Sequence, residues 1–276
     1  MLVNPNQMLK NAYHGKYAIP HFNASTGEFV KIILATCEKL NSPVVIGFNE
    51  QAIANVGGFN AAANLVSALI KDIDITVPVA IQFNHGADLD RCDRAMEAGF
   101  TSVMLDAYNL NMADNLALNQ QLVEIAKVKG VSVEAEVSHS RDTGTYDLVK
   151  EAVLLGKETG VDAVAPCLGN VEGLLDADIN LDFNNLKLID SNLNMPLVLH
   201  GGSGVSDHLI IKAISNGIVK VNFATDLDQA WSSAVRKYLI DDFKVHEYHK
   251  ISSIGQSAVA EIIKSKILLL GSNNKA

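Results

Sequence analysis

Residues 196–225 read PLVLHGGSGVSDHLIIKAISNGIVKVNFAT, and the pattern of this stretch decides the fold. Its apolar, β-branched segments at residues 196–201 and 218–224 predict two short buried strands. Residues 206–216 between them carry apolar side chains three and four positions apart, which is typical of an amphipathic helix. A strand, a helix and a second strand in this order indicate one unit of a parallel α/β sheet.

The same alternation continues from this unit toward both ends of the chain. Strands are predicted at residues 18–23, 43–48, 77–84, 102–107, 132–137, 163–169, 196–201 and 218–224. Helices are predicted at residues 28–40, 60–71, 88–98, 114–129, 148–159, 183–191, 206–216 and 227–239. A last helix is predicted at residues 257–269, before the polar residues 271–276.

Eight strands and eight helices are the count of the (β/α)8 TIM barrel. A doubly wound open sheet would also alternate, but it has roughly five or six strands and a glycine-rich first turn. No G-x-G-x-x-G follows residues 18–23. We therefore predict an α/β fold in which residues 1–276 form a single TIM barrel domain with an extra C-terminal helix.

Composition and charge restrict the partners of this chain. Its 276 residues are 48% hydrophobic and 19% charged, as in a globular protein, and no apolar run is long enough to span a bilayer. The net charge of −9, from 31 acidic and 22 basic residues without a basic cluster, argues against nucleic-acid binding. Three cysteines at unpatterned spacings suit a reducing compartment. We expect a cytoplasmic location and neither a membrane nor a nucleic-acid partner.

Glycines and hydroxyl residues follow the last two predicted strands, where these barrels bind phosphate groups. The candidate residues for a phosphate cradle are Gly201, Gly202, Ser203, Gly204, Asn222, Phe223, Ala224 and Thr225. Glycine permits close backbone approach, and backbone N–H groups near a helix N-terminus bind anions. The alternative is a flexible turn followed by a helix N-cap at Asp226.

Two histidines end predicted strands on opposite sides of the barrel mouth. His85 follows the third strand, His200 ends the seventh, and Glu172 lies in the loop after the sixth. Two imidazoles and a carboxylate are a ligand set that catalytic zinc accepts. The alternative is that each histidine is a hydrogen-bonded strand-end residue and Glu172 a solvated loop charge.

Several long motifs resemble the class II sugar-phosphate aldolases. They are YAIPHFN at residues 17–23, SPVV at 42–45, AGFTSVMLD at 98–106, VEAE at 133–136, PLVLHGGSG at 196–204, KVNFATD at 220–226 and GSNNKA at 271–276. The resemblance covers essentially the whole chain. It implies cleavage of fructose 1,6-bisphosphate or tagatose 1,6-bisphosphate to dihydroxyacetone phosphate and an aldehyde, with a zinc ion that polarises the carbonyl.

The resemblance also implies roles for particular residues. His85 and His200 match zinc ligands, Glu172 stands at the position of a third, and Glu136 is a further metal-ligand candidate. Besides the cradle, Asn23 and Gly173 match substrate-binding positions.

The proton-transfer positions depart from the family pattern. Asn84 replaces an aspartate, and an amide has no titratable proton near neutral pH. The loop after Glu136 lacks the usual Gly-Gly-x-Glu, which leaves Asp106, Asp142 and His139 as candidates for proton transfer.

These departures leave two functions open. The first is a metal-dependent aldolase, with Asn84, Asp106 and Asp142 as its catalytic residues. The second is a catalytically impaired relative that binds sugar phosphates without cleaving them. The resemblance also implies a homodimer or homotetramer.

Overall fold

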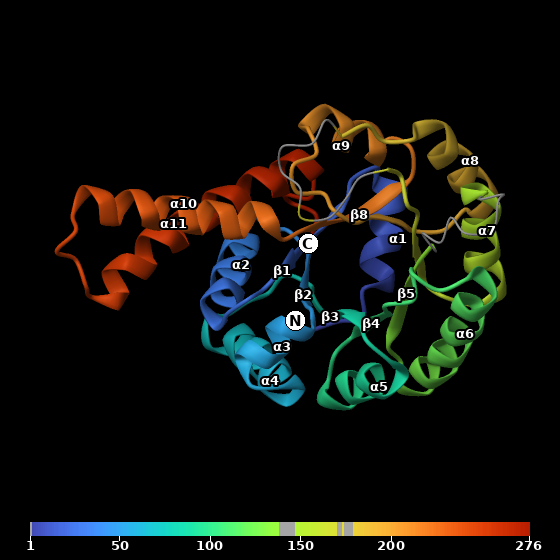
Figure 1. The fold of residues 1–276 in the computed structure, drawn as a ribbon, viewed down its shortest axis with the longest axis horizontal. Coiled ribbons are helices and arrows are strands. Elements are labelled where there is room, and N and C mark those ends of the chain that lie inside the picture. The colour runs from blue at the N-terminus through green and yellow to red at the C-terminus, as the bar shows by residue number, and fades with distance from the viewer. Residues whose placement is uncertain (1, 138–146, 170–172, 174–178) are drawn as a thin grey trace.

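The computed structural model describes residues 2–137, 147–169, 173 and 179–276. Within them, eight parallel strands form a closed barrel in which each strand pairs with the next and β8 pairs with β1 (Figure 1). Closure brings His21 opposite Asn222, although about two hundred residues of chain separate them. The predicted TIM barrel is confirmed.

The strands are short and almost entirely buried. They are β1 (Ile19–Asn23), β2 (Val44–Phe48), β3 (Val79–Gly86), β4 (Ser102–Leu105), β5 (Ser132–Glu136), β6 (Ala163–Ala165), β7 (Leu197–Leu199) and β8 (Ile218–Phe223). Each predicted strand overlaps one of these. The predicted sixth and seventh strands run too long, because the chain leaves the sheet before the positive-φ glycines Gly169 and Gly201.

Helices surround the barrel and mostly follow the prediction. They are α1 (Asn6–Gly15), α2 (Gly27–Lys39), α3 (Glu50–Val56), α4 (Phe59–Asp72), α5 (Leu89–Ala98), α6 (Met112–Lys129), α7 (Leu148–Glu158), α8 (Phe183–Leu193), α9 (Asp207–Ile214), α10 (Thr225–Asp241) and α11 (Tyr248–Leu270). The prediction missed α1 and α3 and began the last helix nine residues too late.

The core has two parts. The larger lies between the outer faces of the strands and the helices that cover them. The smaller fills the N-terminal end of the barrel, where Ile19, Val45 and Val198 pack against Met8 and Leu9 of α1. This end is mostly apolar, although Ser132 at the start of β5 donates a hydrogen bond of 2.8 Å to Asn6 of α1.

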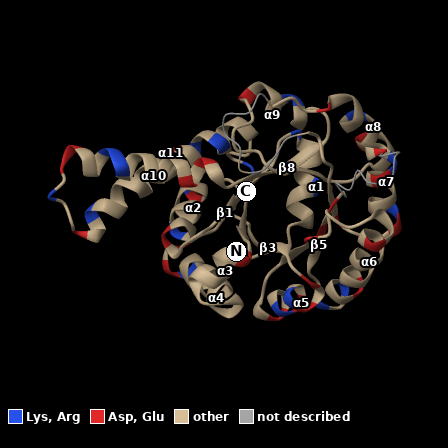
Figure 2. Cartoon of the chain, viewed as in Figure 1, with Lys and Arg blue, Asp and Glu red and all other residues tan. Residues whose placement is uncertain are grey.

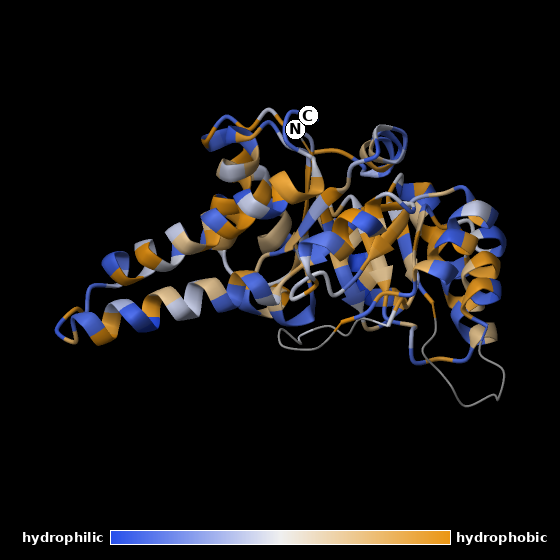
Figure 3. Cartoon of the chain, turned by 90° about the horizontal axis from the view of Figure 1, so that it is seen from above, coloured by the Kyte–Doolittle hydropathy of each residue, from blue (hydrophilic) through white to orange (hydrophobic). Residues whose placement is uncertain are grey.

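A helical hairpin leaves the body of the barrel. α10 and the first half of α11 run side by side away from the strands, as Figures 1 and 3 show from two directions. Near the tip, Ile240, Phe243 and Tyr248 are 73%, 84% and 69% exposed. We call α10 and residues 248–257 of α11 the arm.

Charged side chains are spread over the outer helices, with basic and acidic residues interspersed in the view of Figure 2.

No single helix among the described residues is long and apolar enough to span a membrane. Only α3 and α4 taken together meet that criterion, and they are bent by 73° relative to one another.

Candidate active site

Polar side chains line the interior of the barrel in two levels near the carboxyl ends of the strands. Side chains two residues apart on a strand point to the same face, so each of several strands contributes to both levels. The lower level contains His21, Gln82, Glu134 and Lys220, and the upper level contains Asn23, Asn84, Glu136, His200 and Asn222. Catalytic groups of TIM barrels lie at this end.

The two predicted histidines meet at the mouth of the barrel. The ring centroids of His85 and His200 are 5.5 Å apart, with the rings at 68° to one another. His85 has a φ of +55°, in the left-handed region that is uncommon for residues other than glycine. Strained backbone of this kind is often found at functional sites. The fold therefore brings together two imidazoles from opposite sides of the barrel.

Both ring nitrogens of His200 face carboxylates of β5. Nε2 lies 2.9 Å from Glu134 Oε1, and Nδ1 lies 3.4 Å from Glu136 Oε1. Burial alone would lower the pKa of His200, but Glu136 and Glu134 raise it to about 10. Burial would likewise raise the pKa of Glu134, but Lys220 and His200 hold it well below its ordinary value. The two carboxylates of β5 therefore favour the protonated form of His200.

Two asparagines present amides at the mouth. Asn84 is 2% exposed and Asn222 is 5% exposed. The side-chain oxygen of Asn84 and both polar atoms of the Asn222 amide have no hydrogen-bond partner among the described residues. A buried amide without a partner costs about 1–3 kcal/mol, so such groups in a site are suited to a polar ligand.

The predicted cradle consists of the loop after β7 and the residues that lead from β8 into α10. Gly201 and Gly204 have positive φ values of +57° and +78°. Gly202 has no space for a side chain, since a Cβ there would overlap Val221 Cγ1 and lie 2.8 Å from Asn222 O.

Ser203 joins the two loops of the cradle. Its Oγ accepts hydrogen bonds of 3.2 Å from the backbone N–H groups of Ala224 and Asp226, so two donors at the N-terminus of α10 bind Ser203. Thr225 is the first residue of α10, and the side chain of Phe223 is buried against Phe22, with ring centroids 5.9 Å apart.

Other predicted site residues lie elsewhere. Asp106 is exposed and, with Asp88 and Asp90, lines a cavity of about 420 Å³ whose lining includes neither histidine of the mouth. Gly173 is exposed with a φ of +83°. Asp142, His139 and Glu172 lie outside the described residues, so the predictions for them stay predictions.

The described residues supply only part of a ligand set for a metal ion. His85 and His200 supply two imidazoles at one point, and imidazole is a preferred ligand of zinc and related ions. No group of three or more His, Cys, Asp or Glu residues that could hold a metal is found among the described residues. A complete ligand set would need a residue such as Glu172.

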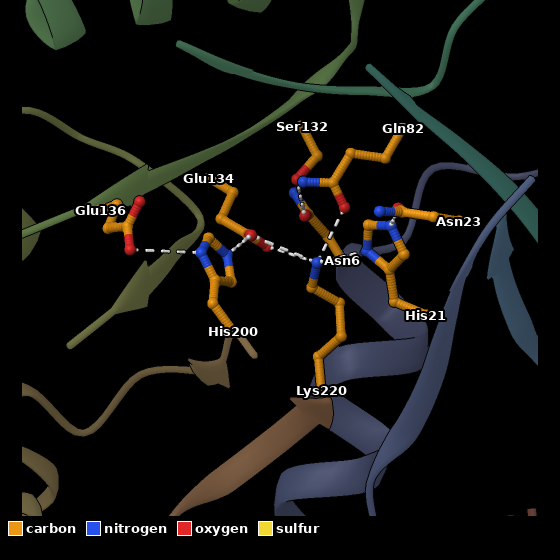
Figure 4. A network of polar contacts seen from close by, with 9 residues as sticks. All are labelled: Asn6, His21, Asn23, Gln82, Ser132, Glu134, Glu136, His200 and Lys220. Atoms are coloured by element: carbon orange, nitrogen blue, oxygen red, sulfur yellow. Dashed lines mark hydrogen bonds and ion pairs between the residues drawn. The ribbon is translucent and has the colours of Figure 1, made fainter. Parts of the chain in front are cut away.

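The lower polar level was not predicted as part of the site. Lys220 is 1% exposed and contacts His21, Gln82 and Glu134 inside the barrel (Figure 4). A signal for it was present in the sequence. The predicted strands carry pairs of polar residues two positions apart, which places both members on one face. The pairs are His21 with Asn23, Gln82 with Asn84, Glu134 with Glu136, and Lys220 with Asn222.

Comparison with known proteins gives the family of the chain. The family described as "Fructose-bisphosphate aldolase class-II" matches residues 3–275. The chain is 39% identical to the fructose-bisphosphate aldolase of Geobacillus stearothermophilus, over 100% of this chain and 99% of that protein. It is 37% identical to the 6-phospho-5-dehydro-2-deoxy-D-gluconate aldolase of Halalkalibacterium halodurans, over 100% and 98%.

A solved structure gives the same result. The YdjI aldolase from Escherichia coli is 30% identical and superposes with a TM-score of 0.88, with 100% of both chains covered. The chain belongs to the class II fructose-bisphosphate aldolase family. Its relatives are named aldolases, which are lyases, and the family is generally dependent on a divalent metal.

Proposed function

We propose that this protein catalyses metal-dependent, reversible aldol cleavage of a sugar bisphosphate to dihydroxyacetone phosphate and an aldehyde. Fructose 1,6-bisphosphate and tagatose 1,6-bisphosphate are the substrates we favour. The observation that carries the proposal is the mouth of the barrel, where His85 and His200 meet beside the buried, unpartnered amide of Asn222.

In this proposal His85 and His200, together with Glu172, would hold Zn²⁺ or another divalent ion. When bound, the ion would supply Lewis-acid polarisation of the substrate carbonyl. The cradle at residues 201–204 and 222–225 would hold a phosphate, since glycine-rich backbone at a helix N-terminus binds anions. Asn23, Asn222 and Gly173 would contact the remaining oxygens of the substrate.

The proposal gives Asn84 an orienting role. Its buried amide can bind a substrate hydroxyl, but it cannot act as a general acid or base near neutral pH. Proton transfer would fall to Asp106, His139 or Asp142. Asp106 is exposed beside β4, and the other two lie outside the described residues. The variants Asp106→Asn and Asp142→Asn distinguish the two aspartates. The substitution that removes the proton-transfer group should lower kcat strongly and change KM little.

The replacement at Asn84 also supports a second candidate, a protein that binds sugar phosphates without cleaving them. Calorimetric titration with dihydroxyacetone phosphate distinguishes the two, when combined with an assay of turnover on both bisphosphates. Tight binding without turnover would favour the second candidate, whereas binding with turnover favours the aldolase.

The relative from Halalkalibacterium halodurans indicates a third substrate to test. It is named for cleavage of a phosphorylated deoxy sugar acid, 6-phospho-5-dehydro-2-deoxy-D-gluconate. We would measure cleavage of this compound beside the two bisphosphates. A higher kcat/KM on the sugar acid than on the bisphosphates would mean that the protein is an aldolase whose preferred substrate is the sugar acid.

The proposed mechanism is tested by His85→Ala and His200→Ala, with His208→Ala as the matched control. His208 is exposed on α9, outside the barrel interior. We expect either mouth variant to lower cleavage by at least about a hundredfold, because each removes a proposed metal ligand. Unchanged cleavage in both would show that the mechanism is wrong. We further propose a homodimer or homotetramer in the cytoplasm.

A further inference from the structure

A buried lysine lies at the centre of the lower polar level. The ammonium of Lys220 is 2.9 Å from His21 Nδ1, 2.8 Å from Gln82 Oε1 and 2.8 Å from Glu134 Oε2 (Figure 4). An ammonium has three N–H donors and no acceptor, so these three contacts satisfy it completely.

These contacts fix the proton on His21. Since Lys220 can only donate, His21 Nδ1 accepts, and the ring proton is on Nε2. Nε2 lies 3.0 Å from Asn23 Oδ1 and therefore donates to it. The oxygen of Asn23 is thereby occupied, which leaves its NH₂ group as the end of the amide that can face a substrate.

The same lysine fixes the carboxylate beside His200. Glu134 is acceptor-only when ionised, so the proton of His200 that faces it is on Nε2, 2.9 Å from Oε1. His200 then presents Nδ1 on the side of Glu136 and the mouth. A carboxylate that orients a ligating imidazole in this way is a recurrent partner of metal sites.

Stability alone is a poor explanation for this arrangement. A buried ion pair is often replaced by apolar residues of similar size without loss of stability. The packing around it is also specific, because a Cβ on Gly47 would overlap His21 Nε2 and lie 2.5 Å from Asn23 Oδ1. β2 therefore leaves room for the contact between His21 and Asn23.

We propose that Glu134 and Lys220 are a pair of positioning residues: Glu134 orients His200 so that Nδ1 is the nitrogen offered to the metal, and Lys220, through His21, turns the NH₂ group of Asn23 toward the substrate. The inference rests on the proposed function for the identity of metal and substrate. The hydrogen-bond directions do not depend on it.

Glu134→Gln tests the contact with His200. In this variant an NH₂ group replaces one carboxylate oxygen and can only donate, and the negative charge is lost. Lys220 and His200, which now contact both oxygens of Glu134, must then share the single amide oxygen, so the contact with His200 is weakened. We expect the affinity of the metal-free protein for Zn²⁺, measured by competition with a chromophoric chelator, to fall by about 10- to 100-fold. The double variant Glu134→Gln/Lys220→Met removes the competitor and should regain most of that affinity, which a merely structural role does not predict.

Lys220→Met tests the contact with His21. Nuclear magnetic resonance of ¹⁵N-labelled histidine rings, with His21→Gln for assignment, should show a single proton on Nε2 of His21 in the parent and a changed protonation pattern in the variant. KM for the sugar phosphate should rise more than kcat falls. Lys129→Met is the control, because Lys129 of α6 pairs with Asp93 of α5 at 2.5 Å, away from both this network and the cradle.

The outcomes separate this inference from the proposed function. The inference would be overturned if Glu134→Gln bound Zn²⁺ as tightly as the parent protein does. It would also be overturned if the ring signals of His21 were the same in Lys220→Met as in the parent. If the parent binds no Zn²⁺, the proposed metal is wrong, and the ring signals of His21 still decide whether Lys220 positions this residue. Should Lys220→Met fail to fold, the double variant provides the same ring measurement without an unpaired buried carboxylate.

Discussion

Gly202 occupies a point in the cradle where the chain has no space for a side chain. A Cβ there would overlap Val221 and approach the carbonyl oxygen of Asn222. We predict that Gly202→Ala lowers the free energy of unfolding by about 1–3 kcal/mol, because overpacked side chains force the backbone to shift. Chemical denaturation measures this. Gly27→Ala on α2 is the control, since its Cβ would be 3.4 Å from Leu65 and alanine favours the helix; an equal loss in both variants would refute the prediction.

Glu38 provides a pH-dependent contact far from the site. Its carboxylate accepts hydrogen bonds from Thr76 Oγ1 and from the backbone N–H groups of Thr76 and Val77, just before β3. Burial would raise the pKa of Glu38, but these hydrogen bonds lower it overall. A lowered folded-state pKa means that the stabilisation is complete above the unfolded value, about 4.3, and is lost as pH falls through the folded value.

We therefore predict that Glu38→Gln destabilises the protein at pH 7 and that its difference from the parent shrinks below about pH 4.3. Urea denaturation at several pH values measures this difference. Glu124→Gln, at an exposed position on α6, is the control. A difference that stays constant between pH 7 and pH 3 would contradict the assigned role of Glu38.

Individual residues of the site could be predicted from the sequence only where they end a strand. His85 and His200 were predicted to meet at the mouth, and the structure places their rings together. Lys220 was overlooked because a lysine inside a barrel is unusual. Its partners His21, Gln82 and Glu134 also come from three other strands that are far from it in the sequence. The predictions for Glu172 and Asp142 are not tested by the described residues.

At the scale of elements, the arm depends on small residues between its helices. A Cβ on Gly255 of α11 would overlap the indole of Trp231 on α10. We predict that Gly255→Ala separates the two helices and shifts the fluorescence of Trp231, which is the only tryptophan of the chain. Ser253→Ala, at an exposed position of the same helix, should leave the emission unchanged. Identical emission from parent and Gly255→Ala would show that the contact is not as close as described.

The arm also explains why element prediction failed where it did. The first half of α11 packs through Ser252 and Gly255, which give no hydrophobic signal, so the predicted helix began at residue 257. α3 has seven residues, too few to show helical periodicity. α1 carries its apolar side chains at Met8, Leu9 and Ala12, over scarcely two turns. The longer helices around the barrel were predicted because one face of each is buried by the strands.

At the scale of the whole molecule, the sequence predicted closure of the barrel through the count of eight strand and helix units. It could not predict how the register of β8 on β1 stacks the two polar levels, because that depends on pairing between residues about two hundred positions apart. The fold was therefore accessible from local pattern, whereas the internal network required the three-dimensional structure.

The proposed assembly is a prediction at this same scale. We expect light scattering coupled to size-exclusion chromatography to give the mass of two or four chains. The exposed apolar residues at the tip of the arm are consistent with burial in an assembly, since large apolar patches often mark interaction surfaces. A mass of one chain across micromolar concentrations would contradict this expectation.

The central claim is that the mouth of this barrel cleaves a sugar bisphosphate with the help of a divalent metal. The most direct test measures cleavage of fructose 1,6-bisphosphate and tagatose 1,6-bisphosphate before chelation, after removal of metal by a chelator, and after addition of Zn²⁺. We predict turnover on at least one substrate, loss of that turnover on chelation, and recovery with Zn²⁺ in the parent but not in His200→Ala. Turnover that survives complete chelation, or folded protein that cleaves neither substrate with Zn²⁺ present, would contradict the claim.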